Sequence, residues 1–130
     1  MARKVLLIGH CGADASYLRI AVRAADPESQ VLAADDESEL QQTVKDGVDL
    51  VLVNRELGWG FGSDSGVDLI GSLHKAHPDL KLMLISNHAD AQAAAVAAGA
   101  LPGFGKRELG SARVKEMLKE LLGAQPKEVG

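Results

Sequence analysis

The sequence predicts an α/β domain in which five short strands alternate with five helices, a pattern written (βα)5. Three observations lead to this prediction. Short apolar runs recur along the chain, stretches with helical spacing of apolar residues separate them, and most of the runs are continuously apolar rather than alternating. Continuous apolar runs are typical of parallel strands that helices cover on both faces.

The predicted strands are short and rich in aliphatic residues. They span Val5–Ile8, Gln30–Ala34, Leu50–Val53, Leu82–Ile85 and Leu101–Gly105. The predicted helices lie between and after these strands and show start and stop signals. They cover Leu18–Ala25 before Pro27, Asp36–Val44, Leu69–Ala76 before Pro78, Asp90–Ala98 before Gly99, and Ser111–Leu122 before Gly123.

This alternation predicts a doubly wound parallel five-stranded sheet of the flavodoxin-like type, with strand order 2-1-3-4-5. In such sheets the functional site lies at the carboxyl ends of the strands. The rule selects polar or flexible residues that directly follow a strand. They are Gly9, His10, Cys11, Asn54, Ser86–His88 and Lys106.

Composition narrows the class of protein. The chain has 130 residues, of which 46% are hydrophobic and 25% charged, so we expect one domain over residues 1–123 and a short polar tail over 124–130. The formal net charge of -4 provides no basic face for phosphates, which argues against direct nucleic-acid binding.

The cysteine count and the hydropathy of the sequence indicate in which cellular compartment the protein is located. The single cysteine, Cys11, cannot form an internal disulfide, and no long apolar segment indicates membrane insertion. We therefore expect a cytoplasmic protein with no membrane contact.

Several phrases in the sequence resemble the receiver domain of two-component response regulators. They are VDLVLVNREL, SGVDLI, LKLMLISNHAD, AAVAAGA and GFGKREL, and the resemblance runs from Lys4 to Leu122. It implies an acidic pair after the first strand, a phospho-accepting aspartate after the third, Ser or Thr after the fourth and Lys after the fifth. Only Ser86 and Lys106 match this pattern. Gly9 and His10 replace the acidic pair, and Asn54 replaces the acceptor.

These replacements predict that the phosphorylation chemistry is lost. Magnesium prefers carboxylate oxygens and retained waters, which Gly9 and His10 do not supply. The Asn54 carboxamide is a neutral and poor nucleophile. We expect a non-phosphorylatable domain with no catalytic residue, no metal and no cofactor. Lys106 then has no acid at the matching positions, and Asn54 is expected to accept its hydrogen bond.

The sequence also departs from the family near the fifth strand. Arg107 rather than proline follows Lys106, and Gly103 replaces an aromatic residue of the family. Phe104 is one residue closer, and strand alternation predicts that it points to the same side as Lys106.

Without chemistry, the domain is expected to act by binding a signalling protein whose identity the sequence does not give. The resemblance implies a partner surface on the fourth helix, fifth strand and fifth helix, with Phe104, Arg113 and Lys119 as candidate contacts. Trp59 and Phe61 lie in a glycine-rich loop. They are either an exposed partner anchor or a cover that folds back onto the pocket. The sequence leaves open whether the domain forms a homodimer.

One enzyme alternative uses Cys11. The segment LLIGHCGADAS resembles the cysteine loop of the B components of sugar phosphotransferase systems, in which a helix start holds a phosphocysteine. Asp14 argues against this alternative, because it occupies the part of the loop where the phosphate would lie.

Overall fold

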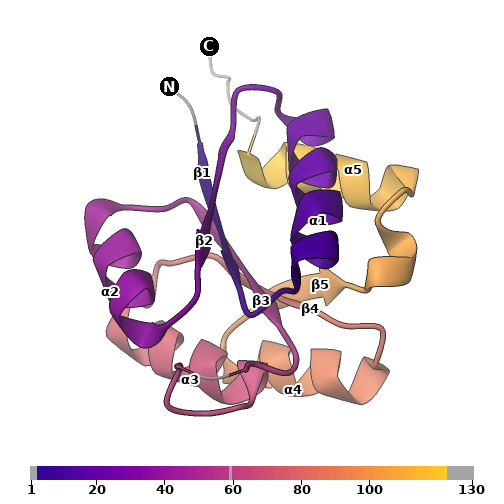
Figure 1. Ribbon diagram of the computed structural model, residues 1–130. Helices are drawn as coiled ribbons and strands as arrows, with labels where there is room; N and C mark the ends of the chain where they lie inside the picture. The colour runs from indigo at the N-terminus through magenta and orange to yellow at the C-terminus, as the bar shows by residue number, and fades with distance from the viewer. Residues whose placement is uncertain (1–2, 59, 123–130) are drawn as a thin grey trace.

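Five parallel strands form one sheet in the order β2-β1-β3-β4-β5 (Figure 1). The computed structural model describes residues 3–58 and 60–122. The strands are β1(Lys4–Ile8), β2(Gln30–Ala34), β3(Leu50–Asn54), β4(Leu82–Ile85) and β5(Leu101–Phe104). The helices are α1(Gly12–Ala25), α2(Glu37–Asp46), α3(Gly66–Ala76), α4(Ala89–Ala98) and α5(Ala112–Leu122). The predicted fold class and strand order are confirmed.

Helices cover both faces of the sheet. Figure 1 shows α1 and α5 on one face and α2, α3 and α4 on the other. Alternate strand residues pack into the two layers, so that Leu6 and Ile8 face α2–α4 while Val5 and Leu7 face α1 and α5. Because both sets are buried, the strands read as continuously apolar in sequence.

Local capping fixes where the helices begin. Asp36 accepts a hydrogen bond from the Glu39 backbone N–H at 2.8 Å and so starts α2, as its position before an acidic turn predicts. Cys11 precedes α1, and its Sγ accepts the Asp14 backbone N–H at 3.5 Å. Helix α1 therefore starts only a few residues after β1, which places its first turn beside the carboxyl edge of the sheet.

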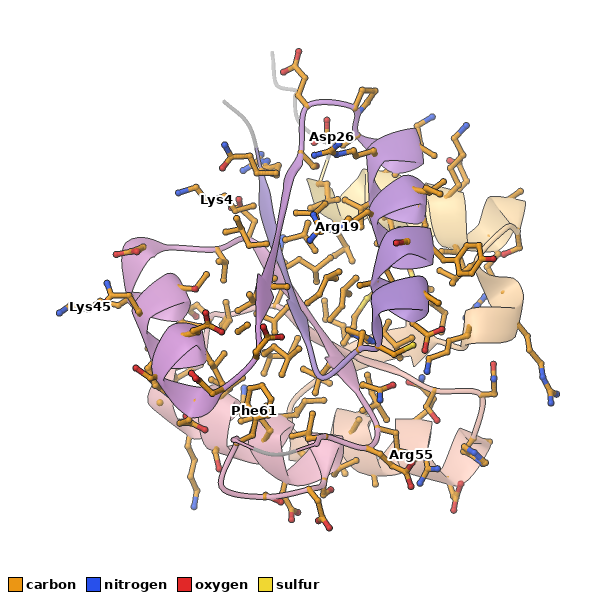
Figure 2. All side chains as sticks on the ribbon, viewed as in Figure 1. Lys4, Arg19, Asp26, Lys45, Arg55 and Phe61 are labelled. Atoms are coloured by element: carbon orange, nitrogen blue, oxygen red, sulfur yellow. The ribbon has the colours of Figure 1, made fainter. Side chains whose placement is uncertain are left out.

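The two edge strands have distinct features. On β2, the Val31 carbonyl accepts a hydrogen bond of 2.9 Å from Arg19 Nη1, and Figure 2 shows Arg19 reaching from α1 toward this strand. On β5, Leu101 pairs with Met83 and Phe104 pairs with Ile85. Two residues of β5, Pro102 and Gly103, therefore lie opposite Leu84 alone, which is a β-bulge.

Strand β5 ends at Phe104, and a short 3-10 helix over Lys106–Glu108 follows. Strand alternation does not extend to Lys106, so the argument that placed Phe104 and Lys106 on the same side was wrong. In the described part of the chain, no helix combines the length and apolar character needed to cross a bilayer. Trp59, Gly123 and the predicted tail 124–130 lie outside the described residues.

Candidate functional site

The carboxyl edge of the sheet holds a small polar cavity, and three of the five predicted site residues line it. The cavity has a volume of about 130 Å³. We call it the edge cavity. Asn54, Ser86 and Lys106 line it, as predicted from their positions after β3, β4 and β5, together with Arg55, Glu56 and His88 among others. Gly9 and His10 are not among its lining residues.

Lys106 forms an ion pair with Asp14 in the first turn of α1. The Lys106 Nζ atom lies 2.6 Å from Asp14 Oδ2, and both side chains are partly exposed. The hydrogen bond from Lys106 lowers the pKa of the Asp14 carboxyl below its ordinary value, outweighing the opposite effect of burial. Lys106 has no acid at the matching strand-end positions, as expected, but the first turn of a helix supplies an acidic partner that was not predicted.

Asn54 does not accept a hydrogen bond from Lys106, so that prediction was also wrong. Its Nδ2 donates to the Glu56 backbone carbonyl at 2.7 Å. This bond ties the carboxamide to the loop that follows β3. Asn54 therefore stabilises its own loop, while Lys106 is held by α1.

The His10 imidazole turns back onto β3. Its Nε2 lies 2.9 Å from the Leu52 carbonyl oxygen. Since a carbonyl only accepts, Nε2 carries the proton. Burial lowers the pKa of His10, and the nearby Lys106 charge lowers it further, against the raising effect of the Leu52 bond. His10 is therefore neutral at pH 7 and adds no positive charge to the edge cavity.

The backbone conformation at position 9 explains why a glycine occupies it. Its φ is +78°, and a Cβ built there would lie 2.6 Å from Leu57 Cδ2 in the loop after β3. Left-handed backbone disfavours any side chain, and Leu57 fills the adjacent space with only 5% of its surface exposed. A carboxylate at this position would require both the turn and the loop to change.

Ser86 is almost fully buried at the end of β4, with 7% of its surface exposed. Its Oγ accepts a hydrogen bond from the His88 backbone N–H at 3.1 Å, and its own N–H donates to the Phe104 carbonyl at 3.0 Å. Ser86 thus links the start of α4 to β5.

Phe104 and Phe61, two of the predicted partner contacts, are buried side chains, so the prediction that they contact a partner was wrong. Phe104 is 1% exposed and packs with α1 and α5, because the bulge directs it into the core. Phe61 is 5% exposed and packs against the core under α2 and α3, and Figure 2 shows its ring directed inward. Phe61 therefore folds back into the core and does not line the edge cavity, so it is neither an exposed anchor nor a cover for that pocket. Trp59 lies outside the described residues.

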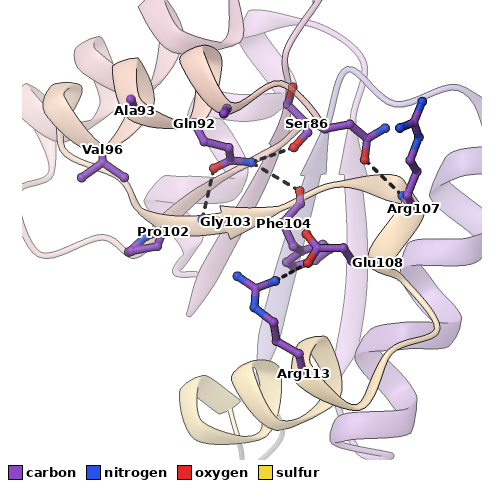
Figure 3. A pocket seen from close by; sticks show the side chains of 12 residues that line it. Ser86, Gln92, Ala93, Val96, Pro102, Gly103, Phe104, Arg107, Glu108 and Arg113 are labelled. Carbon is purple, nitrogen blue, oxygen red and sulfur yellow. Dashed lines mark hydrogen bonds and ion pairs between the residues drawn. The ribbon is translucent and has the colours of Figure 1, made fainter.

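An open groove of about 730 Å³ runs between α4 and α5 across β5 (Figure 3). We call it the α4–β5–α5 groove. Ala93 and Val96 of α4, Pro102 of β5 and the charged Arg107 and Arg113 contribute to its lining. Glu108 accepts a hydrogen bond from Arg113 Nη1. Lys119 lies farther along α5 and is exposed.

Cys11 is exposed, but its surroundings do not favour a phosphocysteine. The thiol contributes to the lowered pKa of Asp14, and this carboxylate occupies the start of α1 beside it. A phosphoryl group on Cys11 would meet a negative charge at the helix start that is meant to hold it. The described residues contain no cluster of three His, Cys, Asp or Glu side chains arranged to hold a metal ion.

Sequence reasoning missed two residues. Asp14 could have been found by applying the carboxyl-edge rule to the first turn of the helix as well as to the strand end. Gln92 makes four contacts to the backbone of β4 and β5 and their ends, as described below. Its signal is that it is the only long neutral polar side chain in the alanine-rich stretch of α4.

The fold is that of response-regulator receiver domains, the CheY-like fold. Three solved structures illustrate the likeness. The signal receiver domain of the DNA-binding response regulator merR from Colwellia psychrerythraea has a TM-score of 0.75 and 18% identity, covering 92% of this chain and 97% of that one. A response regulator from Thermotoga maritima has a TM-score of 0.70 and 22% identity, covering 95% and 100%.

A CheY-like receiver domain from Methanospirillum hungatei has a TM-score of 0.63 and 20% identity, covering 93% and 97%. At these identities the likeness establishes the fold. No protein-family model matches the sequence, and no curated protein matches it either.

Proposed function

We propose that this protein is a receiver-like signalling domain that is not phosphorylated at position 54 and acts by binding a partner protein. The observation that carries the proposal is the arrangement at the edge cavity. A carboxamide, Asn54, ends β3, and the lysine at the end of β5 is bound to Asp14.

Phosphoryl transfer at this edge would lack both of its main requirements. The transferred group needs a nucleophile in line and a metal ion to neutralise charge. Asn54 is neutral, Gly9 has no side chain, and His10 donates its Nε2–H to Leu52. Magnesium prefers oxygen ligands and charged carboxylates, which these residues do not offer.

The partner surface that we propose is the α4–β5–α5 groove with the adjoining face of α5. Val96 is 44% exposed beside the groove, which gives an apolar contact next to the positive charges of Arg107 and Arg113. Lys119 adds a positive charge on α5. In the free protein Arg113 pairs with Glu108 and Lys119 lies 3.9 Å from Glu116, so a partner carboxylate would compete with these exposed pairs. Apolar contacts surrounded by charged groups are typical of transient interfaces. A partner with carboxylates facing α5 fits this surface best.

The first experiment tests for phosphorylation. The protein is incubated with magnesium and either acetyl phosphate or beryllium fluoride, and intact mass and thermal stability are recorded. We expect neither to change. A magnesium-dependent adduct on a residue lining the edge cavity would refute the proposal. Labelling from a phosphohistidine carrier that disappears in Cys11→Ser would support the phosphocarrier alternative.

The second experiment locates the partner surface. Proteins captured from native lysate by the wild type are compared with those captured by the double variant Arg113→Glu, Lys119→Glu. We expect the variant to lose its specific partner, with a salt-dependent slowing of association. The double variant Lys45→Glu, Lys75→Glu makes the same charge change at exposed positions on α2 and α3 and should still bind.

Two further variants test other surfaces. Trp59→Ala examines the glycine-rich loop without removing Phe61, which a loop truncation would take out of the core. Ile20→Ala examines α1, where Tyr17 and Ile20 are 62% and 66% exposed. Loss of the partner in either variant, with binding intact in the Arg113 and Lys119 variant, would move the surface to that element.

A further inference from the structure

The Gln92 side chain on α4 contacts four backbone groups of β4, β5 and their ends, and Figure 3 shows the contacts to Ser86, Gly103 and Phe104. Its Nε2, which has two hydrogens, lies 2.8 Å from the Leu84 carbonyl oxygen, 3.0 Å from that of Ser86 and 3.4 Å from that of Phe104, so one hydrogen is shared between two of these acceptors. Its Oε1 accepts the Gly103 N–H at 3.2 Å. The carboxamide orientation is set by its partners, because carbonyls only accept and an N–H only donates.

The bulge in β5 explains why these backbone groups need a side-chain partner. Pro102 and Gly103 share a single opposing residue, Leu84, so the regular ladder is interrupted there. Gly103 is buried, and a Cβ at this position would collide with the Leu84 carbonyl and lie 3.0 Å from Gln92 Oε1. The close approach of the two strands and the carboxamide leaves room for glycine only. Gln92 thus gives the Leu84 carbonyl and the Gly103 N–H a side-chain partner at the bulge, and it also contacts the Phe104 carbonyl, which accepts the Ser86 N–H.

Helix α4 has few other attachments to the sheet. Ala95 is its only buried residue, and Ala91 and Ala98 are partly buried. Methyl side chains leave the lateral position of a helix weakly specified, because they interdigitate little with the layer below. The hydrogen bonds of Gln92 are directional, so they fix the lateral position of α4 on the sheet where packing leaves it weakly specified.

We propose that Gln92 is a permanent clamp that holds α4 on β4 and β5 and gives the α4–β5–α5 groove one fixed shape, ready for a partner without a prior signal. The inference rests on the proposed function, because it concerns the same partner surface. Ala93 and Val96, which form one wall of the groove, lie within one turn or so of Gln92 on α4, while Pro102 and Gly103 on β5 form part of the other. The width of the groove is therefore set by the bonds between Gln92 and the strands.

Amide hydrogen exchange on the full chain tests the clamp. Gln92→Met keeps the length of the side chain but removes all four hydrogen bonds. We expect the Gly103 amide and the α4 amides to exchange at least about tenfold faster in this variant, equivalent to about 1.4 kcal/mol. Amides of β1 and β3 should keep wild-type rates. Gln41→Ala is the control, because the Gln41 carboxamide on α2 bonds to the exposed Glu37 side chain.

If the amides of Gly103 and α4 exchange in Gln92→Met at the same rates as in the wild type, the clamp is refuted. The volume of the side chain, without its hydrogen bonds, would then be enough to hold α4 in place. If the variant does not fold, exchange of the wild type in increasing urea replaces it. The clamp predicts that Gly103 and the α4 amides open together as one unit, and separate opening would overturn it.

The clamp and the partner surface can fail separately. Faster exchange in Gln92→Met, with binding unaffected by Arg113→Glu and Lys119→Glu, would support the clamp and refute the proposed surface. Loss of binding in that double variant, with unchanged exchange in Gln92→Met, would support the surface and refute the clamp.

Discussion

Lys106 and Asp14 join the end of β5 to the first turn of α1, with 2.6 Å between Nζ and Oδ2. The positive charge at the carboxyl edge is thus balanced from within the protein. This pairing does not involve the side chain at position 54. Asn54 is therefore not needed to hold Lys106 in place.

Replacing Asp14 should weaken this connection. We expect Asp14→Asn to lower the free energy of unfolding by about 0.5–1 kcal/mol at pH 7, since the pair is partly exposed. Because the folded pKa of Asp14 is lowered from 3.8, its contribution is present above that value and is lost as the pH falls through the folded pKa. Urea unfolding at pH 7 and pH 2.5 measures both effects.

Asp90→Asn is the matched control for this measurement. Asp90 also lies in the first turn of a helix, α4, so both variants lose a similar interaction with the helix dipole. Equal losses in the two variants at pH 7 would show that the Lys106 pair adds nothing.

Adding a side chain at Gly9 should destabilise the fold. We expect Gly9→Ala to cost about 1–2 kcal/mol, because its φ of +78° is unfavourable for any L-residue with a Cβ. Gly12→Ala is the control, since Gly12 starts α1 and has open space around it. Chemical denaturation of both variants checks the difference, and equal stability would contradict the backbone argument.

Restoring the acid at position 54 alone should not restore phosphorylation. We expect Asn54→Asp to show no mass increase with acetyl phosphate and magnesium, because Gly9 and His10 still provide no carboxylate for the metal. The triple variant Gly9→Asp, His10→Asp, Asn54→Asp supplies all three acids but carries the Gly9 backbone strain. Efficient labelling of the single variant would show that the metal site is not the missing part.

The partly buried His10 should make the free energy of unfolding depend on pH near neutrality. Its folded pKa is lowered from 6.5 by burial, so its contribution is complete above that value and decreases as the pH falls below it. We expect the free energy of unfolding of the wild type to fall as the pH is lowered from 7.5 to 5. His10→Gln, which can still donate to Leu52, should flatten this dependence between pH 7.5 and 5.

His88→Gln serves as the control, because His88 is exposed at the start of α4. Thermal unfolding across the same pH range compares the three proteins. A wild-type slope that survives in His10→Gln would place the titrating group elsewhere.

The sequence predicted the sheet well because its signals are local and repeated. The runs at Val5–Ile8 and Leu50–Val53 are apolar throughout, and helix-ending residues such as Pro27 and Pro78 separate the elements. The strand order followed from the handedness of the connections and the doubly wound pattern, which the observed sheet confirms.

The site was predicted only in part, because its interactions depend on side chains from distant elements. Asn54, Ser86 and Lys106 each follow a strand in the sequence, so we predicted that they lie together. All three line the edge cavity. The partner of Lys106 could not follow from strand ends, since Asp14 lies on a helix. Phe104 was misjudged because a bulge shifts β5 by one residue, and a bulge depends on pairing with β4 that sequence periodicity does not report.

The same irregularity in β5 bears on how the protein behaves at high concentration. Exposed edge strands can recruit strands from other molecules and lead to aggregation. Pro102 removes an N–H donor from one edge of the sheet, and the bulge makes that strand irregular. At the opposite edge, Arg19 occupies the Val31 carbonyl of β2. Both borders are thereby poor templates for fibril growth, which is compatible with the partner binding proposed above.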